Sequence, residues 1–391
     1  MRELRSWPWR VLILAALVGV MVDFDGTVLY LALPAIAADF HAPVAELSQA
    51  ASVLALGSVL ALPLGALADR RGRRLTLVLV TIGFAAGNFL SGLAPSLAWL
   101  AVARLITVCF ATAALGLALT IVIEASPARH RSLLVTAVSF GGGAGAGVTA
   151  VLYPLLAPHW RYLYLLGGGS ILLAAALWRW LPESQVWKDA GRGDNPAGLL
   201  LRPQWRGRLA IIGLSGFLSF IAFQPGGFFG ALFASRDLHF SPFLISAVLF
   251  TSAPLAVPGY LLGGLLSDRH GRRVPGTLFW SLAALFAGVT YSGRPALYWI
   301  GNATWTFMDG AASPITGAWF GELFPTRARA TAQAVATVAG ALGGIVGLQL
   351  VGRLEPSLGL GPSIVLLSVA AFLGALVLLF LPETGGKPLP E

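Results

Sequence analysis

The chain has 391 residues, of which 57% are hydrophobic and 11% are charged, and its mean hydropathy is +0.79. A water-soluble fold of this length has no use for so much apolar surface, so the composition excludes one and indicates a membrane protein. The formal net charge of +9 suggests a nucleic-acid partner at first sight. However, the basic residues are dispersed over short loops rather than gathered on one face, so we expect a lipid bilayer and no nucleic acid.

The first apolar run follows MRELRSWPWR and continues past two aspartates to Ala38. It has no small-residue cleavage site after a short apolar core, so it predicts a retained first helix rather than a signal peptide. A membrane span needs about 20 mostly apolar residues. By that length the first half contains helices at 10–37, 45–68, 75–94, 97–123, 132–156 and 160–181. The second half contains helices at 208–234, 242–266, 274–292, 295–321, 330–352 and 362–381.

The predicted fold class is therefore an all-α membrane protein with 12 transmembrane helices. We expect an N-terminal six-helix bundle over 1–181, a central linker over 182–206 and a C-terminal six-helix bundle over 207–391. Twenty-one of the 26 lysines and arginines fall in the loops and ends on one side of these helices. The positive-inside rule then places both termini and the linker in the cytoplasm, and predicts a multi-pass protein of the plasma membrane.

One loop sequence occurs twice. GALADRRGRR, Gly65 to Arg74, returns as GLLSDRHGRR, Gly264 to Arg273, 199 residues later. Other pairs keep nearly the same spacing: Pro43 with Pro242, Glu124 with Glu322, Arg131 with Arg329, and Glu183 with Glu383. Nearly constant spacing across different motifs predicts that a six-helix unit was duplicated in the same orientation, as a parallel repeat.

With these loop motifs the chain resembles the major facilitator superfamily over essentially its whole length. LPES at 181–184, GELFPTRARAT at 321–331 and LPETGGK at 381–387 are similar to the sugar and metabolite porter branch. FDG at 24–26, with Pro34 nine residues after Asp25, resembles the first helix of aromatic-acid:proton symporters. The resemblance implies alternating access, with a substrate site near the membrane midplane between two six-helix halves.

Asp23 and Asp25 lie near the middle of the first predicted span. A charged aspartate at the bilayer centre costs roughly 2.5–3.5 kcal/mol, so we expect at least one of them to handle protons or substrate. Residues two positions apart on a helix differ by about 200° of rotation, so Asp23 and Asp25 cannot both face one cavity. On the resemblance we assign Asp25 to the cavity and leave Asp23 against a neighbouring helix. The alternative is a neutral, hydrogen-bonded structural carboxylic acid.

Arg104 is the only basic residue that lies more than three positions from the end of a predicted span. A buried arginine stays charged and needs an anion, either a protein carboxylate, a substrate carboxylate or each in turn. The hypothesis is that protonation of Asp25 frees Arg104 to bind an anionic substrate. A structural salt bridge to Asp23 is the alternative.

The second half keeps polar groups that are mostly neutral in the corresponding spans. We expect four of its residues to orient substrate: Gln224, Asn302, Trp305 and Asp309. Asp309 has the alternative of pairing only within the protein. QPGG at 224–227 predicts a local break that frees backbone carbonyls, with a packing kink as the alternative. GGGAGAG at 141–147 lies in a span with no strand before it, and predicts close helix packing, with a hinge as the alternative, rather than a phosphate loop.

The two loop copies and the acidic and basic residues near them are expected to form a conformational latch on the cytoplasmic side, as the resemblance implies. Each ion pair would contribute only about 1 kcal/mol because it is partly exposed. In the first half the latch residues are Gly65, Asp69, Arg70, Gly72, Arg73, Glu124 and Arg131. In the second half they are Gly264, Asp268, Arg269, Gly271, Arg272, Glu322 and Arg329.

The sequence therefore predicts a secondary active transporter and not an enzyme, since no nucleotide loop, metal cluster or nucleophile constellation occurs in it. We expect proton-coupled uptake of a small organic acid, with aromatic acids among the candidates. We expect a monomer with no cofactor other than the coupling proton and no metal. The alternatives are proton-driven efflux of amphipathic compounds and uptake of a neutral solute such as a sugar. The single cysteine, Cys109, is expected to be a small core residue.

Overall fold

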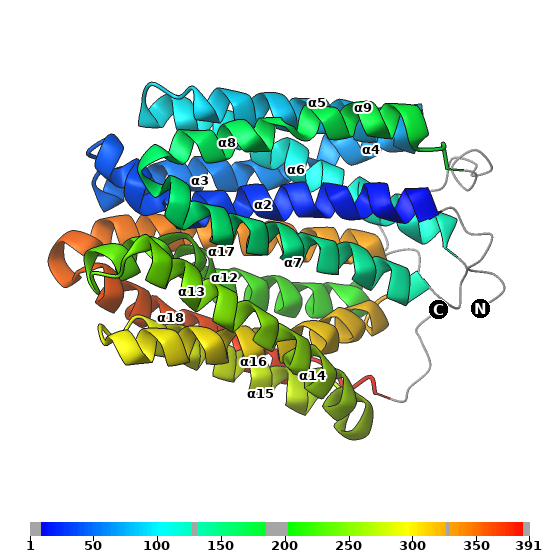
Figure 1. The fold of residues 1–391 in the computed structure, drawn as a ribbon. Coiled ribbons are helices and arrows are strands. Elements are labelled where there is room, and N and C mark those ends of the chain that lie inside the picture. The colour runs from blue at the N-terminus through cyan, green and yellow to red at the C-terminus, as the bar shows by residue number, and fades with distance from the viewer. Residues whose placement is uncertain (1–8, 127–130, 185–201, 326–328, 386–391) are drawn as a thin grey trace. The chain divides into compact units, whose positions relative to one another are not determined.

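The computed structural model describes residues 9–126, 131–184, 202–325 and 329–385, and these residues contain helices and no strand (Figure 1). The first half comprises α2 (Trp9–Asp39), α3 (Val44–Leu60), α4 (Leu62–Arg71), α5 (Arg73–Gly92), α6 (Leu97–Ala125), α7 (Arg131–Leu156), η2 (Ala157–His159), α8 (Trp160–Gly168) and α9 (Ser170–Trp180). The second half comprises α12 (Pro203–Arg236), α13 (Pro242–Ser252), η3 (Ala253–Leu255), α14 (Ala256–His270), α15 (Arg273–Thr290), α16 (Pro295–Glu322), α17 (Arg329–Leu358), α18 (Leu360–Val377) and η4 (Leu378–Phe380).

Every predicted span coincides with a helix or with consecutive helices, which confirms the all-α membrane fold class. Nine helical stretches within the described ranges are long and apolar enough to cross a membrane. Two predicted spans are divided where proline removes a backbone N–H. One is split into α3 and α4, with Pro63 in the first turn of α4. The other is split into α13 and α14 by η3, which contains Pro254.

Within each copy of the repeated loop, a glycine ends one helix and leads into the next. Gly72 joins α4 to α5 with a φ of 105°, and Gly271 joins α14 to α15 with a φ of 84°. Both values lie in the region that glycine adopts without strain because it has no Cβ. A tight turn is therefore present at this motif in both halves.

The described residues form two compact units. Unit 1 comprises Met1–Ala42 and Val53–Arg192, and unit 2 comprises Pro43–Ser52 and Gly193–Glu391. In unit 1, α2 packs against α7 and α5 packs against α6, while in unit 2 the corresponding helices α12 and α17, and α15 and α16, form the same pairs. Since residues 185–201 lie outside the described ranges, the bundle limits at 181 and 207 stay a prediction.

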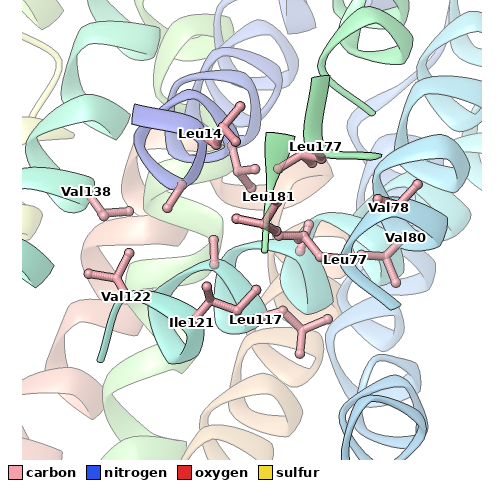
Figure 2. Packing of buried hydrophobic residues seen from close by; sticks show 14 of the residues in the cluster. Leu14, Leu77, Val78, Val80, Leu117, Ile121, Val122, Val138, Leu177 and Leu181 are labelled. Carbon is pink, nitrogen blue, oxygen red and sulfur yellow. The ribbon is translucent and has the colours of Figure 1, made fainter. Parts of the chain in front are cut away.

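An apolar core fills the centre of unit 1. Figure 2 shows Leu14 of α2, Leu77 of α5, Leu117 of α6 and Leu177 of α9 converging in it. In unit 2 the rings of Trp205, Trp319 and Phe324 belong to a comparable core. Fully burying a large apolar side chain contributes about 1.5–3 kcal/mol relative to water. Inside a membrane this gain is absent, because lipid tails are as apolar as the side chains. The interiors of the two units therefore depend on close packing.

Glycines bring the first helix of each unit close to its partner. A Cβ added at Gly145 of α7 would lie 2.0 Å from the Val20 carbonyl oxygen of α2, and one at Gly347 of α17 would lie 2.0 Å from the Ile221 oxygen of α12. Only glycine fits at such separations. This confirms the packing role predicted for the glycine-rich segment at 141–147.

Candidate functional site

A buried ion pair joins α2 and α6 inside unit 1. The two terminal nitrogens of the Arg104 guanidinium donate to the two carboxylate oxygens of Asp25, at 2.6 Å and 2.7 Å. The side chains are 1% and 3% exposed. Two parallel charge-assisted hydrogen bonds of this kind fix both distance and orientation. Of Asp23 and Asp25, it is Asp25 that pairs with Arg104.

Local structure holds both ends of this pair. Asp25 lies in the middle of α2, next to Phe24, whose carbonyl oxygen accepts a hydrogen bond from the Thr149 hydroxyl of α7 at 3.0 Å. Arg104 lies two turns into α6, which begins after Ser96. The Ser96 hydroxyl accepts from the Trp99 N–H at 3.3 Å and so caps the helix. The two charges therefore stand on well-anchored helices.

Tyr164 of α8 is a third member of this site that sequence reasoning missed. The Cζ atom of Arg104 lies 4.9 Å from the centre of the Tyr164 ring, and Trp160 packs edge-on against the same ring at 5.8 Å. The Tyr164 hydroxyl and the Arg104 Nε are buried and have no hydrogen-bond partner among the described residues. A tyrosine in an apolar helix gives no sequence signal of this kind, because it is a common core residue.

Asp23 points to a different neighbour. It is half-buried, and its Oδ2 would lie 2.1 Å from a Cβ added at Gly142 of α7. The half-turn between Asp23 and Asp25 therefore separates them as the helical geometry predicts. Asp23 lies against α7, as expected, and the alternative salt bridge between Asp23 and Arg104 is not formed.

In unit 2 the predicted substrate residues lie on α12 and α16. Asn302, Trp305 and Asp309 share one face of α16, since they are three and four residues apart, and all three are partly buried. Trp305 packs against Gly226 of α12. Gln224 lies beside Gly344 of α17. No side-chain hydrogen bond joins Gln224, Asn302 or Asp309 to one another in the described structure.

Aromatic rings that the sequence did not single out surround Trp305. Phe223 of α12 lies 5.7 Å from Trp305 and stacks on Trp280 of α15, with ring centres 5.5 Å apart and planes inclined by 24°. Phe223 directly precedes Gln224 and is partly buried. An adjacency of this sort between residues far apart in sequence cannot be deduced from spacing.

The predicted break at QPGG is wrong, because α12 runs without interruption from Pro203 to Arg236 with Pro225 inside it. Proline removes one N–H from the helix, whereas the surrounding carbonyls find other contacts. The Tyr291 hydroxyl donates to the Gly226 carbonyl oxygen, and the Tyr298 hydroxyl donates to the Gly230 oxygen at 2.9 Å. The backbone there is tied to unit 2 rather than left free.

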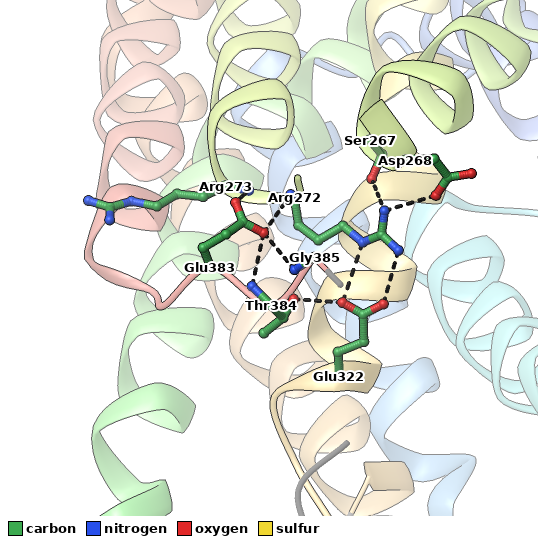
Figure 3. A network of polar contacts seen from close by, with 8 residues as sticks. All are labelled: Ser267, Asp268, Arg272, Arg273, Glu322, Glu383, Thr384 and Gly385. Atoms are coloured by element: carbon green, nitrogen blue, oxygen red, sulfur yellow. Dashed lines mark hydrogen bonds and ion pairs between the residues drawn. The ribbon is translucent and has the colours of Figure 1, made fainter. Parts of the chain in front are cut away.

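The second copy of the repeated loop is the centre of a polar network (Figure 3). Arg272 binds Glu322 at 3.2 Å and Asp268 at 3.0 Å. The Glu383 carboxylate accepts hydrogen bonds from the backbone N–H groups of Arg272, Arg273, Thr384 and Gly385, at 2.8–2.9 Å. The Thr384 hydroxyl donates to Glu322 at 2.6 Å. Glu383 therefore caps the start of α15 and was missed as a member of the latch set.

The pKa shifts of Glu383 and Arg272 follow from the hydrogen bonds of this network. Partial burial acts to raise the pKa of Glu383, but the four backbone N–H groups outweigh it and lower that pKa below its usual 4.5. The hydrogen bond to Glu322 is the main cause that raises the pKa of Arg272, so this guanidinium stays charged. Both groups are ionised at neutral pH and hold the turn together.

Unit 1 has the same arrangement in simpler form. The Glu183 carboxylate accepts from the N–H groups of Arg73 and Arg74 at 2.9 Å and 3.1 Å, and Arg73 pairs with Glu124 at 3.3 Å. The spacing of Glu124 with Arg131, and of Glu322 with Arg329, suggests pairing between neighbouring helix ends, but the side chains of Arg131 and Arg329 lie outside the described residues. The described partners of these glutamates are Arg73 and Arg272, because the turns place those guanidinium groups beside them.

The remaining predicted latch residues lie at the same turns. Arg70 and Arg269 are exposed, whereas Gly65 and Gly264 are partly buried. The side chains of Asp69, Arg131 and Arg329 lie outside the described part of the structure. All the ion pairs named for these loops are formed within one unit, so each cluster fixes a turn of its own bundle.

Known proteins of similar sequence are transporters. The gallate transporter of Pseudomonas putida is 26% identical over 97% of this chain and 92% of its own length. The 3-(3-hydroxy-phenyl)propionate transporter of Escherichia coli is 29% identical over 80% of this chain and 77% of its own length. Both are named for aromatic acids, which agrees with the resemblance drawn from the FDG segment. The chain is therefore a transporter rather than an enzyme.

The fold also has solved counterparts. The xylose transporter XylE from E. coli, in an inward open conformation, superposes with a TM-score of 0.77 at 18% identity and covers 97% of both chains. The family model described as Major Facilitator Superfamily matches residues 15–348 and 212–390. With twin helical units, a repeated turn motif and these matches, the chain belongs to the Major Facilitator Superfamily.

Proposed function

We propose that this protein is a secondary active transporter that couples an inward flow of protons to the uptake of a small aromatic acid. The observation that carries the proposal is the buried pair between Arg104 and Asp25, with side chains 1% and 3% exposed. An ion pair removed from water is a costly way to gain stability, since its desolvation penalty can exceed the Coulombic gain. Its retention in a membrane span therefore favours a functional role.

The proposed cycle uses exchange of one carboxylate for another. A proton that reaches Asp25 neutralises it and weakens both hydrogen bonds to Arg104. The guanidinium, which stays charged, then binds the carboxylate of the substrate. When substrate and proton leave on the other side of the membrane, Asp25 becomes charged again and restores the pair.

An aromatic substrate is supported by two further observations. Two relatives whose similarity covers most of this chain are named for gallate and hydroxyphenylpropionate. In addition, Phe223 and Trp305 present partly buried rings that lie 5.7 Å apart, on the same two helices as Gln224 and Asn302. Aromatic rings attract one another in stacked or edge-on arrangements. We assign ion coupling to unit 1 and substrate orientation to Gln224, Asn302, Trp305 and Asp309 of unit 2.

The distribution of lysine and arginine supports an orientation of the chain in the membrane. We infer an inner membrane location with both termini in the cytoplasm, because most lysines and arginines flank one side of the spans. The networks around Arg73 and Arg272 then lie on the cytoplasmic side, where they would bias the carrier between its two states. Two single-cysteine variants, Asp237→Cys and Arg269→Cys, each made in Cys109→Ser protein, should differ in their labelling from outside the cell. In intact cells a membrane-impermeant maleimide should label the first and not the second, and the reverse result contradicts the orientation.

The decisive experiment is uptake of radiolabelled benzoate-type acids into proteoliposomes, with and without an inward proton gradient. Wild type should accumulate acid when the gradient is present. Asp25→Asn should lose accumulation but keep exchange of acid for acid, because a permanently neutral residue leaves Arg104 available. Arg104→Gln should lose both. Asp23→Asn, two residues from the pair and facing α7, is the matched control and should accumulate acid.

Two results would overturn the proposal. If no acid is taken up, the substrate class is wrong, and sugars and export of amphipathic compounds become the next assays. If acids accumulate equally with and without the gradient, or equally in Asp25→Asn, the coupling role of Asp25 is wrong.

A further inference from the structure

Arg104 has two partners, and only one of them can change its charge within the proposed cycle. Its terminal nitrogens bind the Asp25 carboxylate, and its Cζ lies 4.9 Å from the centre of the Tyr164 ring. All three side chains are almost fully buried, with Tyr164 at 0% exposure. The guanidinium is thus held by a carboxylate at its edge and by an aromatic ring nearby.

The ring attracts a cation more strongly than it attracts an ion pair. A buried cation over the face of a ring is attracted by the ring quadrupole, and more strongly where water is excluded. While Asp25 is ionised, the net charge beside the ring is zero, so much of this attraction is cancelled. Once Asp25 is protonated, the full charge of Arg104 acts on the ring. Tyr164 therefore stabilises the state with neutral Asp25 more than the state with charged Asp25.

We propose that Tyr164 is a positioning residue that holds the Arg104 guanidinium in place while Asp25 is neutral, and thereby promotes protonation of Asp25. The inference rests on the proposed proton coupling at Asp25 and adds a residue to it. It also explains how a buried guanidinium keeps an attractive contact between losing one carboxylate and binding the next.

The described surroundings contain few other charges that act on this contact. On the helices that pack around α8, the titratable and charged groups are Arg10, Asp23, Tyr30 and Asp39 of α2, Arg73 and Arg74 of α5, and Tyr153 of α7. On α6, which carries Arg104, they are Cys109 and Glu124. Arg161 and Tyr162 lie on α8 itself, His159 lies on η2 and Arg179 lies on α9. Arg161 is paired with Asp39 at 2.6 Å, Arg73 is paired with Glu124, and Asp23 lies against Gly142.

The hydroxyl and the ring of Tyr164 can be tested separately. The hydroxyl has no partner among the described residues, so the attraction assigned to Tyr164 belongs to the ring. Tyr164→Phe keeps the ring, whereas Tyr164→Leu and Tyr164→Met keep an apolar side chain without a π face. Methionine is included because its flexible chain fills the volume if leucine prevents folding.

The experiment is an infrared pH titration of purified protein in liposomes without substrate. The band of the protonated Asp25 carboxyl is identified as the one missing from Asp25→Asn. Its midpoint should move to lower pH by about 1 unit in Tyr164→Leu and Tyr164→Met, because about 1.4 kcal/mol corresponds to one unit. Tyr164→Phe should keep the wild-type midpoint. Tyr153→Met, which alters a buried tyrosine of α7, is the control and should not move it.

Equal midpoints in wild type, Tyr164→Leu and Tyr164→Met would overturn the inference, as would an equal shift in Tyr164→Phe. This readout needs no substrate, so it separates the two proposals. If aromatic acids are not transported but the midpoint shifts as expected, the proposed substrate is wrong and the role of Tyr164 stands.

Discussion

At the scale of single residues, the cost of burying charge was the most informative signal. It identified Asp25 and Arg104 from sequence, and the structure places these two in contact. It could not identify Tyr164, since a tyrosine is a common residue in apolar helices and its position depends on how α8 packs. Glu183 and Glu383 were visible as a matched pair, but their role as caps of α5 and α15 needed the folded turn.

Glu383 should make stability depend on pH. Its pKa is lower in the folded protein than its usual 4.5, so its stabilising effect is complete above that value and is lost as pH falls through the lowered folded value. Glu383→Gln should therefore unfold at a lower temperature than wild type at pH 7. The difference should disappear when both are measured well below pH 4.5.

Thermal unfolding in detergent, followed over a series of pH values, measures this effect. Asp268→Asn is the matched control, because Asp268 contacts the same arginine but its side chain is 78% exposed. If Glu383→Gln and wild type differ by the same amount at every pH, charge on Glu383 does not stabilise the turn.

At the scale of helices, apolar length located the spans well, and proline and packing decided what happened within them. Pro63 and Pro254 fall where a predicted span is divided. Pro225 does not interrupt α12. The Gly226 and Gly230 carbonyls of this helix accept hydrogen bonds from the hydroxyls of Tyr291, which directly follows α15, and of Tyr298 in α16. A proline lies inside the predicted span in all three cases. Whether it divides the helix therefore depends on tertiary contacts that the sequence does not show.

The contact between α2 and α7 should be sensitive to one glycine and indifferent to its near neighbour. Gly145→Ala would place a Cβ 2.0 Å from the Val20 oxygen, whereas a Cβ at Gly147 meets nothing within 4 Å. Overpacking typically costs about 1–3 kcal/mol. Gly145→Ala should therefore lower the unfolding temperature and Gly147→Ala should not. Equal effects in differential scanning fluorimetry would show that the helices can separate at no cost.

At the scale of the whole molecule, the repeat in the sequence predicted that the same helix pairs would form in both halves, and they do. The chemistry of the halves has diverged. By repeat alignment Asn302 corresponds to Arg104 and Gln224 corresponds to Asp25, so neutral side chains stand in unit 2 where unit 1 has an ion pair. The repeat could be deduced because it needs only spacing. The partners of Glu124 and Glu322 could not, because they depend on the direction in which each arginine leaves its turn.

The pairing of one guanidinium with one carboxyl group has an electrical consequence. In the proposed cycle a monovalent acid anion crosses the membrane together with one proton on Asp25, so no net charge moves. Membrane voltage contributes about 2.3 kcal/mol per elementary charge at 100 mV, and an electroneutral carrier gains none of it. Uptake should then follow the pH difference and ignore a potassium diffusion potential set with valinomycin. Voltage-driven accumulation would require a second charge to travel with each turnover.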